Sequence, residues 1–316
     1  MTGLQALADG AAAKPPAGLV LTRRGPGGEI ETVAAGPVDA GAVFELGSIT
    51  KAVTGLLLAD AAVRGEVALD DPLAACLPGA RPRAPITLQE LATHTAGLPR
   101  LPLGYLRRHA IRHRADPYAR STLPELLHDL ARVRPRGRRR RYSNFGAALL
   151  GQALAARLGA PYEDLVHERV LGPLGVAQVW ARGAPPVATP HDRRGRPVPP
   201  WTMGAYAPAG CLRGSAAGAL ALSLACLAPP EPMAAAVALA LTPRKRRGPL
   251  QTGLGWMRSP AGRAGRMWWH NGGTGGSRAF TGFLAERGVA VAAVANAAKS
   301  PDRVAVRVLA GRYASS

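Results

Sequence analysis

Segments with the residue pattern of β-strands stand at both ends of the chain, and their placement constrains the fold more than any other feature. Residues 18–36 (GLVLTRRGPGGEIETVAAG) are typical of two short strands joined by a Gly-Pro-Gly-Gly turn. Residues 265–297 contain three more strand-like stretches, GRMWWHNG, RAFTGFLAE and GVAVAAVANA. An amphipathic stretch over 301–314 predicts a last helix. The simplest arrangement is one antiparallel sheet that takes strands from both ends of the chain.

Helical patterns fill the middle of the chain. Residues 76–200 contain TLQELATHT, TLPELLHDLARV, NFGAALLGQALAARLG and PYEDLVHERVLGPLG, punctuated by Pro and Gly. Residues 185–201 (PPVATPHDRRGRPVPPW) have the composition of a loop or linker, and a further helix is predicted over 215–228. We therefore predict an α/β (α+β) fold with helices flanking the sheet. Residues 1–75 and 201–316 would form the sheet domain, and 76–200 an inserted, mostly helical domain.

Composition places the chain among ordinary globular proteins. It is 47% hydrophobic and 19% charged over 316 residues, which is enough to bury a full core. No stretch approaches the ~18–20 apolar residues that a membrane-spanning helix needs. The N-terminal residues lack a basic segment followed by an apolar one. We therefore expect a cytoplasmic protein, and a misassigned start site would reopen the possibility of secretion.

Residues that could bind metal or form disulfides are few. The three cysteines, Cys76, Cys211 and Cys226, contain no CxxC pair, and we expect buried free thiols. His109 and His113 have the i, i+4 spacing of a possible metal site. No third ligand accompanies them, so we interpret them as surface residues and expect neither metal nor cofactor.

Basic residues give the chain a formal net charge of +20, and nearly all of them are arginine. A basic chain can bind nucleic acid or an anionic surface. The arginines are scattered along the chain, however, and the usage of Arg, Ala, Gly and Pro matches a GC-rich genome, so we expect no nucleic-acid partner. We interpret the run Arg132–Arg141 as a solvated loop. Two alternatives stay open: it lines a cleft and selects anionic substrates, or it binds nucleic acid or an acidic partner.

Lysine is so rare in this chain that the position of Lys51 is informative. Only four of the 40 basic residues are lysine: Lys14, Lys51, Lys245 and Lys299. In FELGSITKAVTGLLLADAAVRG, the segment from Ser48 to Val63 predicts a helix that is apolar on most sides and therefore buried, with Gly65 as its C-cap. Residues three apart share one face of a helix, so Ser48 and Lys51 would stand side by side on the first turn.

A serine beside a buried lysine is a candidate nucleophile with its base. A serine hydroxyl needs an adjacent base to become reactive. Desolvation lowers the pKa of a lysine until it can exist as the free amine, whereas arginine stays protonated. This difference is a physical reason to find Lys51 where the chain otherwise uses Arg. Because an SxxK pattern occurs often by chance, a surface Ser48 and a solvated Lys51 form the alternative interpretation.

Two further segments carry residues suited to acyl chemistry. RRYSNFGAALLGQAL places Tyr142 and Asn144 at the start of another apolar helix, where a phenol can move a proton and an amide can bind an ester or amide group. WWHNGGTGGSRAF places His270 on a strand that opens into Gly272 and Gly273. Glycine lets a backbone N–H approach a ligand closely. The structural alternatives are a capping tyrosine, a strand histidine and a hairpin turn.

The three segments, in this order, resemble the serine β-lactamase and penicillin-binding-protein superfamily. Class A members of that superfamily carry SxxK, SDN and KTG. This chain is similar to the class C branch, in which Tyr-x-Asn replaces SDN and which holds class C β-lactamases, D-alanyl-D-alanine carboxypeptidases, D-aminopeptidases and esterases. The flanks FELGSITKAVTGLLL, GEVALDDPL, ITLQELATHTAGLP, PAGCLRGSAAG and HNGGTGG agree, and together they extend from about Phe44 to Gly282.

The resemblance implies a role for each of five residues. Ser48 would be the acylated nucleophile, and Lys51 would take its proton or tune it electrostatically. Tyr142 would be the general base and later the acid for the leaving group. Asn144 would hold the acyl side of the substrate. The backbone N–H groups of Ser48 and Gly273 would form the oxyanion hole, in which each donor stabilises the transition state by about 3–4 kcal/mol.

The third segment departs from the β-lactamase pattern, because His270 stands where those enzymes usually have Lys. A lysine is a permanent cation for a substrate carboxylate, whereas histidine is one only near or below neutral pH. With Gly272 and Gly273, His270 would still belong to the substrate-binding wall. We therefore predict a serine hydrolase, an esterase or amidase that acts on small or peptide-like acyl substrates. D-alanyl-D-alanine carboxypeptidase or class C β-lactamase activity, and a non-catalytic binding protein on the same fold, are the alternatives.

Overall fold

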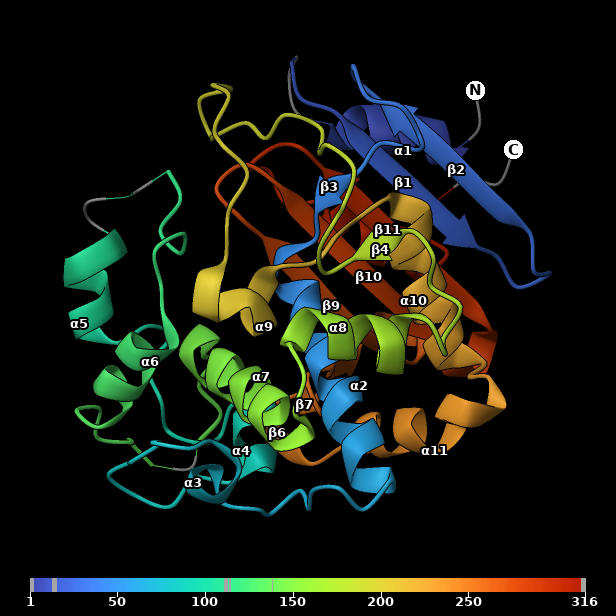
Figure 1. Cartoon of the computed structure of the whole chain (residues 1–316). Coiled ribbons are helices and arrows are strands. Elements are labelled where there is room, and N and C mark those ends of the chain that lie inside the picture. The colour runs from blue at the N-terminus through green and yellow to red at the C-terminus, as the bar shows by residue number, and fades with distance from the viewer. Residues whose placement is uncertain (1–2, 13–15, 111–112, 114, 138, 314–316) are drawn as a thin grey trace.

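The structure, a computed structural model, describes all residues except 1–2, 13–15, 111–112, 114, 138 and 314–316. In the described residues, eight antiparallel strands form the main sheet in the order β2-β1-β11-β10-β9-β8-β7-β6. The strands are β1 (Leu19–Arg24), β2 (Ile30–Ala35), β6 (Lys245–Arg247), β7 (Leu250–Thr252), β8 (Met257–Pro260), β9 (Arg266–Gly273), β10 (Arg278–Leu284) and β11 (Val289–Ala295). N-terminal strands lie beside C-terminal ones in Figure 1, so the prediction of a sheet built from both ends of the chain is confirmed.

The two ends of the chain join where β1 pairs with β11. The register runs from Leu19 opposite Ala295 to Arg24 opposite Ala290. Strand β11, with the sequence VAVAAVA, is buried over nearly its whole length. Such a continuous apolar strand is expected where helices cover both faces of a sheet. A second, three-stranded sheet consists of β3 (Phe44–Glu45), β5 (Arg213–Gly214) and β4 (Val179–Trp180).

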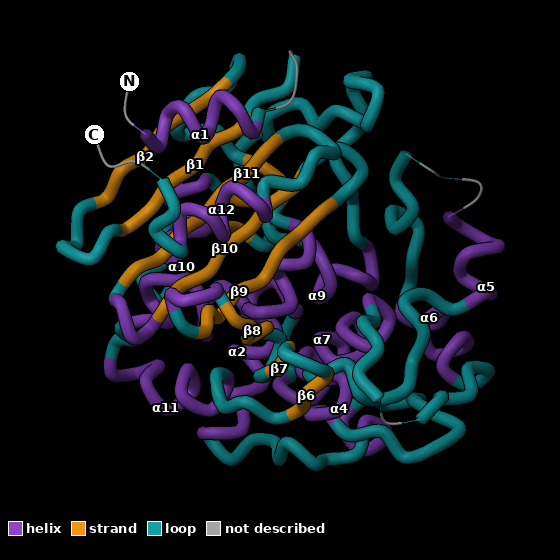
Figure 2. Tube along the Cα trace, turned by 180° about the vertical axis from the view of Figure 1, so that it is seen from behind, coloured by secondary structure: helices purple, strands orange, loops and turns teal. Residues whose placement is uncertain are grey.

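Helices cover both faces of the main sheet. Helices α1 (Gly3–Ala11) and α12 (Asp302–Leu309) pack on one face, in front of the strands in Figure 2. Helix α10 (Ala216–Leu227) packs on the other face and is followed by α11 (Glu231–Ala240). No single helix in the described residues is long and apolar enough to cross a membrane. Helices α10 and α11 together have the length and composition of a membrane-spanning segment, but the chain bends by 88° between them.

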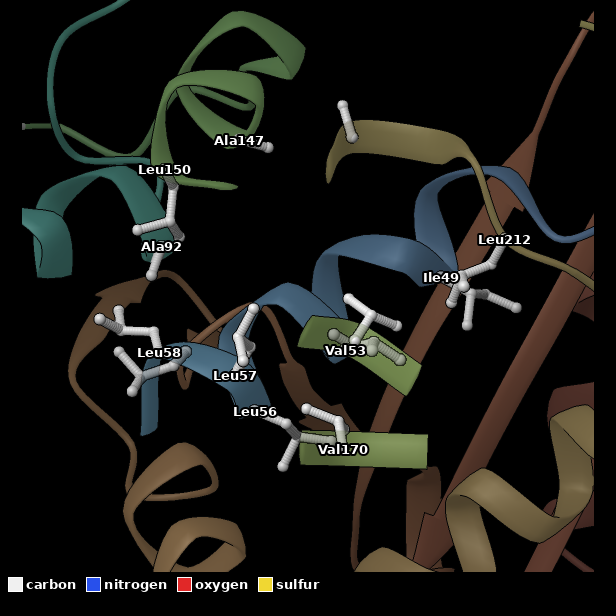
Figure 3. Close-up of a cluster of buried hydrophobic side chains, with 14 of the residues drawn as sticks. Ile49, Val53, Leu56, Leu57, Leu58, Ala92, Ala147, Leu150, Val170 and Leu212 are labelled. Carbon is white, nitrogen blue, oxygen red and sulfur yellow. The ribbon is translucent and has the colours of Figure 1, made fainter. Parts of the chain in front are cut away.

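Helix α2 (Thr50–Val63) lies at the centre of the molecule. Twelve of its residues are buried, as predicted for a helix that is apolar on most sides. Figure 3 shows its side chains among neighbours from several other elements, including Leu150 and Val170. Gly65 follows the helix with φ of 71°, a conformation that favours glycine at a helix end.

The remaining helices and turns, of which α7 with 15 residues is the longest, connect α2 and the strands. They are α3 (Leu73–Cys76), α4 (Leu88–Ala92), α5 (Leu103–Tyr105), α6 (Leu123–Leu130), α7 (Asn144–Leu158), α8 (Tyr162–Val166), α9 (Ala207–Gly210) and the single turns η1 (Gly47–Ile49), η2 (Leu106–Ala110), η3 (His167–Leu171), η4 (Gly204–Tyr206), η5 (Gly262–Ala264) and η6 (Ala285–Arg287). One apolar core runs from the main sheet through α2 into α7. The boundaries 1–75, 76–200 and 201–316 stay a prediction.

Candidate active site

Ser48 and Lys51 meet at the start of the buried helix. The predicted helix begins two residues later than expected, because Ser48 lies on the 3₁₀ turn η1 and α2 begins at Thr50. Gly47 opens this turn with φ of 51°, and the Thr50 hydroxyl closes it by donating to the carbonyl oxygen of Gly47 at 2.7 Å. Within this turn Lys51 Nζ lies 2.9 Å from Ser48 Oγ. The predicted pairing of the two side chains is present in the structure.

Burial controls the protonation of Lys51. The side chain is 3% exposed, and its Nζ also donates to the carbonyl oxygen of Ala209 at 2.6 Å. No carboxylate among the described residues forms an ion pair with it. Desolvation, and then the positive charge of Arg100, lowers the pKa of Lys51 well below its ordinary value. The site therefore favours the neutral amine, which has a lone pair to accept the Ser48 proton.

Tyr142 reaches the same serine from the start of α7. Ser143 caps this helix, accepting from the N–H of Gly146 at 2.8 Å and donating to the carbonyl oxygen of Pro99 at 2.6 Å. These bonds fix the backbone next to Tyr142, whose hydroxyl forms a hydrogen bond with the Ser48 side chain. Burial raises the pKa of Tyr142 to about 12, although that bond and the charge of Arg100 act in the opposite direction. Tyr142 is accordingly a neutral phenol, able to give a proton.

Asn144 presents an unpaired amide oxygen. Its Nδ2 donates to the hydroxyl of Tyr118 at 2.9 Å, which fixes the orientation of the side chain. Its Oδ1 is buried and has no hydrogen-bond partner among the described residues. A buried acceptor without a partner is costly unless a ligand satisfies it. Asn144 lines the cleft, so a substrate N–H is a suitable partner.

His270 lies on β9 behind the cleft wall. It is 1% exposed, and its Nδ1 donates to the carbonyl oxygen of Asn271 at 2.6 Å, which leaves a lone pair on Nε2. Burial is the main cause that lowers the pKa of His270 to about 3, and Lys51 acts in the same direction when it is protonated. The side chain is neutral near pH 7 and does not line the cleft. The cationic contact with a substrate carboxylate that the sequence left open is therefore not supplied by His270.

The two glycines after His270 let β9 touch the Ser48 turn. A Cβ atom on Gly272 would lie 1.8 Å from the carbonyl oxygen of Leu46 and 3.0 Å from the Ser48 nitrogen. A Cβ atom on Gly47 would lie 2.7 Å from the Gly273 nitrogen. Only residues without side chains permit this backbone approach. Ser48, Gly272 and Gly273 thereby share one edge of the cleft.

These residues line a cleft of about 520 Å³ between the sheet and the helices. Its wall contains the predicted Ser48, Tyr142, Asn144, Gly272 and Gly273. Lys51 and His270 lie below this surface. The cleft also contains residues that the sequence analysis did not single out, namely Arg100, Tyr118, Trp201, Met203, Thr274, Arg278 and Asp302.

The sequence as a whole matches a known family. A family model for β-lactamases matches residues 9–314. The chain belongs to the β-lactamase family. The β-lactamase of Escherichia coli K12 is 33% identical over 154 residues, which are 47% of this chain and 37% of that protein. The D-alanyl-D-alanine-carboxypeptidase/endopeptidase AmpH of Escherichia coli K12 is 36% identical over 140 residues, 42% of this chain and 35% of that protein. The matches span less than half the length of these relatives.

Solved structures show that this β-lactamase-family chain has the fold of the family. A class C β-lactamase superposes with a TM-score of 0.83 at 19% identity, covering 99% of this chain and 97% of that chain. A D-stereospecific amidohydrolase from Streptomyces sp. superposes with a TM-score of 0.80 at 23% identity, covering 97% of both chains. The predicted resemblance and fold class are confirmed.

Sequence reasoning missed His94, which packs against the phenol ring. His94 is buried, has a φ of 60° that is uncommon outside glycine, and lies 4.6 Å from Tyr142 between ring centroids. Its Nδ1 accepts the backbone N–H of Ser143 at 3.3 Å. Burial lowers the pKa of His94 well below the ordinary value, and Lys51 acts in the same direction when it is protonated. The only sequence signal was its place in the flank ITLQELATHTAGLP.

Several other predicted features differ from their interpretation or add detail to it. His109 is buried rather than at the surface, and its Nε2 contacts Glu125 Oε1 at 2.9 Å. No group of three His, Cys, Asp or Glu residues able to hold a metal occurs in the described part of the chain.

In the run Arg132–Arg141, the described arginines are exposed except Arg140, which is half-buried and donates to Met257 Sδ at 3.0 Å. The three cysteines are free, two of them buried and Cys211 half-buried.

Proposed function

We propose that this β-lactamase-family chain is a serine hydrolase that forms an acyl-enzyme at Ser48 from an ester or amide substrate. The contact between Lys51 Nζ and Ser48 Oγ at 2.9 Å carries the proposal, because Lys51 is buried without a counter-ion among the described residues. A lysine held in the neutral form can remove the serine proton, which is the step that a serine nucleophile needs.

Acylation would proceed through a tetrahedral intermediate. Lys51 takes the proton of Ser48 as Oγ attacks the carbonyl carbon, and the N–H groups of Ser48 and Gly273 stabilise the developing oxyanion. Tyr142 then donates its phenolic proton to the leaving oxygen or nitrogen as that bond breaks. The proton on Lys51 then returns to the Tyr142 oxygen through a water, because Ser48 Oγ is now an ester oxygen without a proton. Asn144 binds the acyl side through its unpaired Oδ1.

Deacylation uses the same groups in reverse. A water takes the place of the leaving group and attacks the ester carbonyl, and its proton passes to Lys51 by way of Tyr142. Ser48 Oγ leaves as the tetrahedral intermediate collapses and takes the proton from Lys51, which restores the neutral amine. The raised pKa of Tyr142 makes it a proton donor and relay, with Lys51 as the base. This assignment keeps two roles that the family resemblance implied, Lys51 taking the Ser48 proton and Tyr142 acting as the acid, and moves the role of general base from Tyr142 to Lys51.

Intact-protein mass spectrometry tests the proposal. Wild-type protein and Ser48→Ala would each be incubated with a fluorophosphonate, a p-nitrophenyl ester and a penicillin. We expect a fluorophosphonate adduct formed with loss of fluoride, and ester turnover, both absent in Ser48→Ala. A lasting penicilloyl adduct would favour a carboxypeptidase-like enzyme, and rapid penicillin turnover a β-lactamase. No adduct with any reagent would overturn the proposal in favour of a binding protein.

A further inference from the structure

Two arginine side chains line the cleft that contains Ser48. Arg100 follows α4 and is exposed, with its guanidinium carbon 5.8 Å from the centroid of the Tyr142 ring. Arg278 opens β10 and is half-buried. Both residues line the cleft together with the candidate nucleophile. Guanidinium groups stay charged in proteins, so they bring permanent positive charge to this surface.

Arg278 is held in a fixed orientation against the candidate oxyanion hole. Its Nη1 donates to the carbonyl oxygens of Thr274 and Ser277, each at 2.7 Å. A Cβ atom on Gly273 would lie 3.0–3.2 Å from the Arg278 side chain, which shows how closely the two residues pack. The N–H groups on Nε and Nη2 have no hydrogen-bond partner among the described residues. They are available for a planar anion, which arginine binds through two parallel hydrogen bonds.

The protein supplies little negative charge to balance these cations. Asp302 is the only carboxylate in the described cleft wall, and its Oδ2 accepts from Asn271 Nδ2 at 2.6 Å. Glu45 is buried behind the wall and accepts from the hydroxyl of Thr274 at 2.8 Å. Neither Arg100 nor Arg278 forms an ion pair with a described residue. Asp302 and Glu45 act on Arg278 electrostatically without forming an ion pair with it, so both arginines have room for an anionic partner.

We propose that the cleft selects substrates whose acyl part carries a carboxylate, which Arg278 and Arg100 bind together. The inference rests on the proposed acyl-enzyme function. The acyl part is favoured over the leaving group because the Asn144 N–H donates to the carbonyl oxygen of Arg100 at 3.1 Å, so Arg100 adjoins the residue that would hold the acyl side. Arg278 packs on Gly273, which would hold the carbonyl oxygen of the same acyl group.

Matched esters measure this preference. p-Nitrophenyl hydrogen adipate carries a carboxylate on the acyl part, and p-nitrophenyl methyl adipate has the same chain without the charge. A third ester, 3-carboxy-4-nitrophenyl butyrate, carries the charge on the leaving group and is compared with p-nitrophenyl butyrate. We expect wild-type protein to favour the adipate monoanion over its methyl ester by ~10-fold or more in kcat/KM, the range of a charged hydrogen bond. The butyrate pair should show no such preference.

Variants assign the preference to the two arginines. Arg278→Gln and Arg100→Gln should each lower the ratio of the two adipate rates by ~10-fold, and Arg278→Lys, which keeps the charge without the planar fork, should lower it less. Arg263→Gln removes one exposed positive charge from the turn η5, outside the cleft wall, and should leave the ratio unchanged. This control separates a local site from attraction by the net charge of +20.

Failure of this inference and failure of the proposed function give different results. A wild-type ratio near one, a ratio that neither arginine variant changes, or a preference for the carboxylate on the leaving group overturns the inference while turnover at Ser48 stands. If no ester is turned over, the proposed function fails, and calorimetry of monomethyl adipate binding to Ser48→Ala still decides the anion site. Binding lost in Ser48→Ala/Arg278→Gln supports the site, and no binding to Ser48→Ala contradicts it.

Discussion

The floor of the cleft (Lys51, His94 and His270) and its rim (Arg100 and Arg278) both consist of basic side chains. The floor side chains are buried, and desolvation lowers the pKa of each. The rim side chains reach solvent and stay protonated. Burial therefore makes proton acceptors of the floor residues, whereas the rim residues remain cations. In the floor, Lys and His stand where the side chain must be able to lose its proton, which Arg would not do.

Lys51→Arg breaks this division most strongly, because it places a permanent charge in the floor. We expect Ser48 labelling by a fluorophosphonate to slow by about 10³-fold, in the range for loss of a general base. The variant should also lose about 3–5 kcal/mol of unfolding free energy, the cost of an unpaired buried charge. Labelling rates by mass spectrometry and urea unfolding measure both effects. Lys299→Arg, at an exposed position, is the control and should change neither.

Gly272→Ala tests whether the floor depends on backbone contact between β9 and the Ser48 turn. The added Cβ would lie 1.8 Å from the carbonyl oxygen of Leu46, so the strand or the turn must move. We expect a loss of roughly 2–3 kcal/mol in unfolding free energy, as for overpacking in a core, together with slower Ser48 labelling. Gly10→Ala in α1, where a Cβ meets nothing within 4 Å, should be neutral or slightly stabilising. Equal stability of both variants would contradict the close approach.

His270→Gln tests whether the buried His270 is neutral in the folded protein. The quantity to follow is the free energy of unfolding as the pH is lowered. The folded pKa of His270 is about 3 and its unfolded value about 6.5, so the unfolded chain binds more protons between these pH values. The free energy of unfolding should therefore fall as pH decreases from 6.5 towards 3, by up to about 3 kcal/mol at pH 4 from this residue alone. Urea unfolding at pH 7, 5 and 4 measures the profile. A wild-type slope identical to that of His270→Gln would contradict the assignment.

The salt dependence of kcat/KM distinguishes the exposed rim from the buried floor. It is the smallest of the effects expected here. Exposed charges are screened, whereas buried groups are screened much less. Raising NaCl from about 50 to 500 mM should lower kcat/KM for the adipate monoanion by about 2- to 5-fold, because the Debye length falls from more than 10 Å to a few ångströms. The kcat/KM of the methyl ester should change little. The same loss for both esters would indicate a general salt effect and remove the distinction between rim and floor.

The sequence predicted the catalytic segments better than the shape of the cleft. Ser48 with Lys51, and Tyr142 with Asn144, are local patterns, so helix geometry was enough to place each pair side by side. Arg100, Arg278 and His94 are brought to the site by tertiary packing, of α4 on α7 and of β9 and β10 on η1, and no local pattern encodes these contacts. The burial that makes His270 neutral is likewise a property of the packed sheet rather than of the motif.

The protonation state of Lys51 tests the central claim most directly. The chain has only four lysines, so ¹³C-lysine labelling gives four Cε signals that NMR can follow from pH 5 to 11, with Lys51→Arg assigning one of them. The account predicts that the Lys51 signal titrates well below the others, with the neutral amine forming as pH rises through its lowered pKa. Four signals that all titrate near 10.4, the ordinary value for lysine, would contradict it.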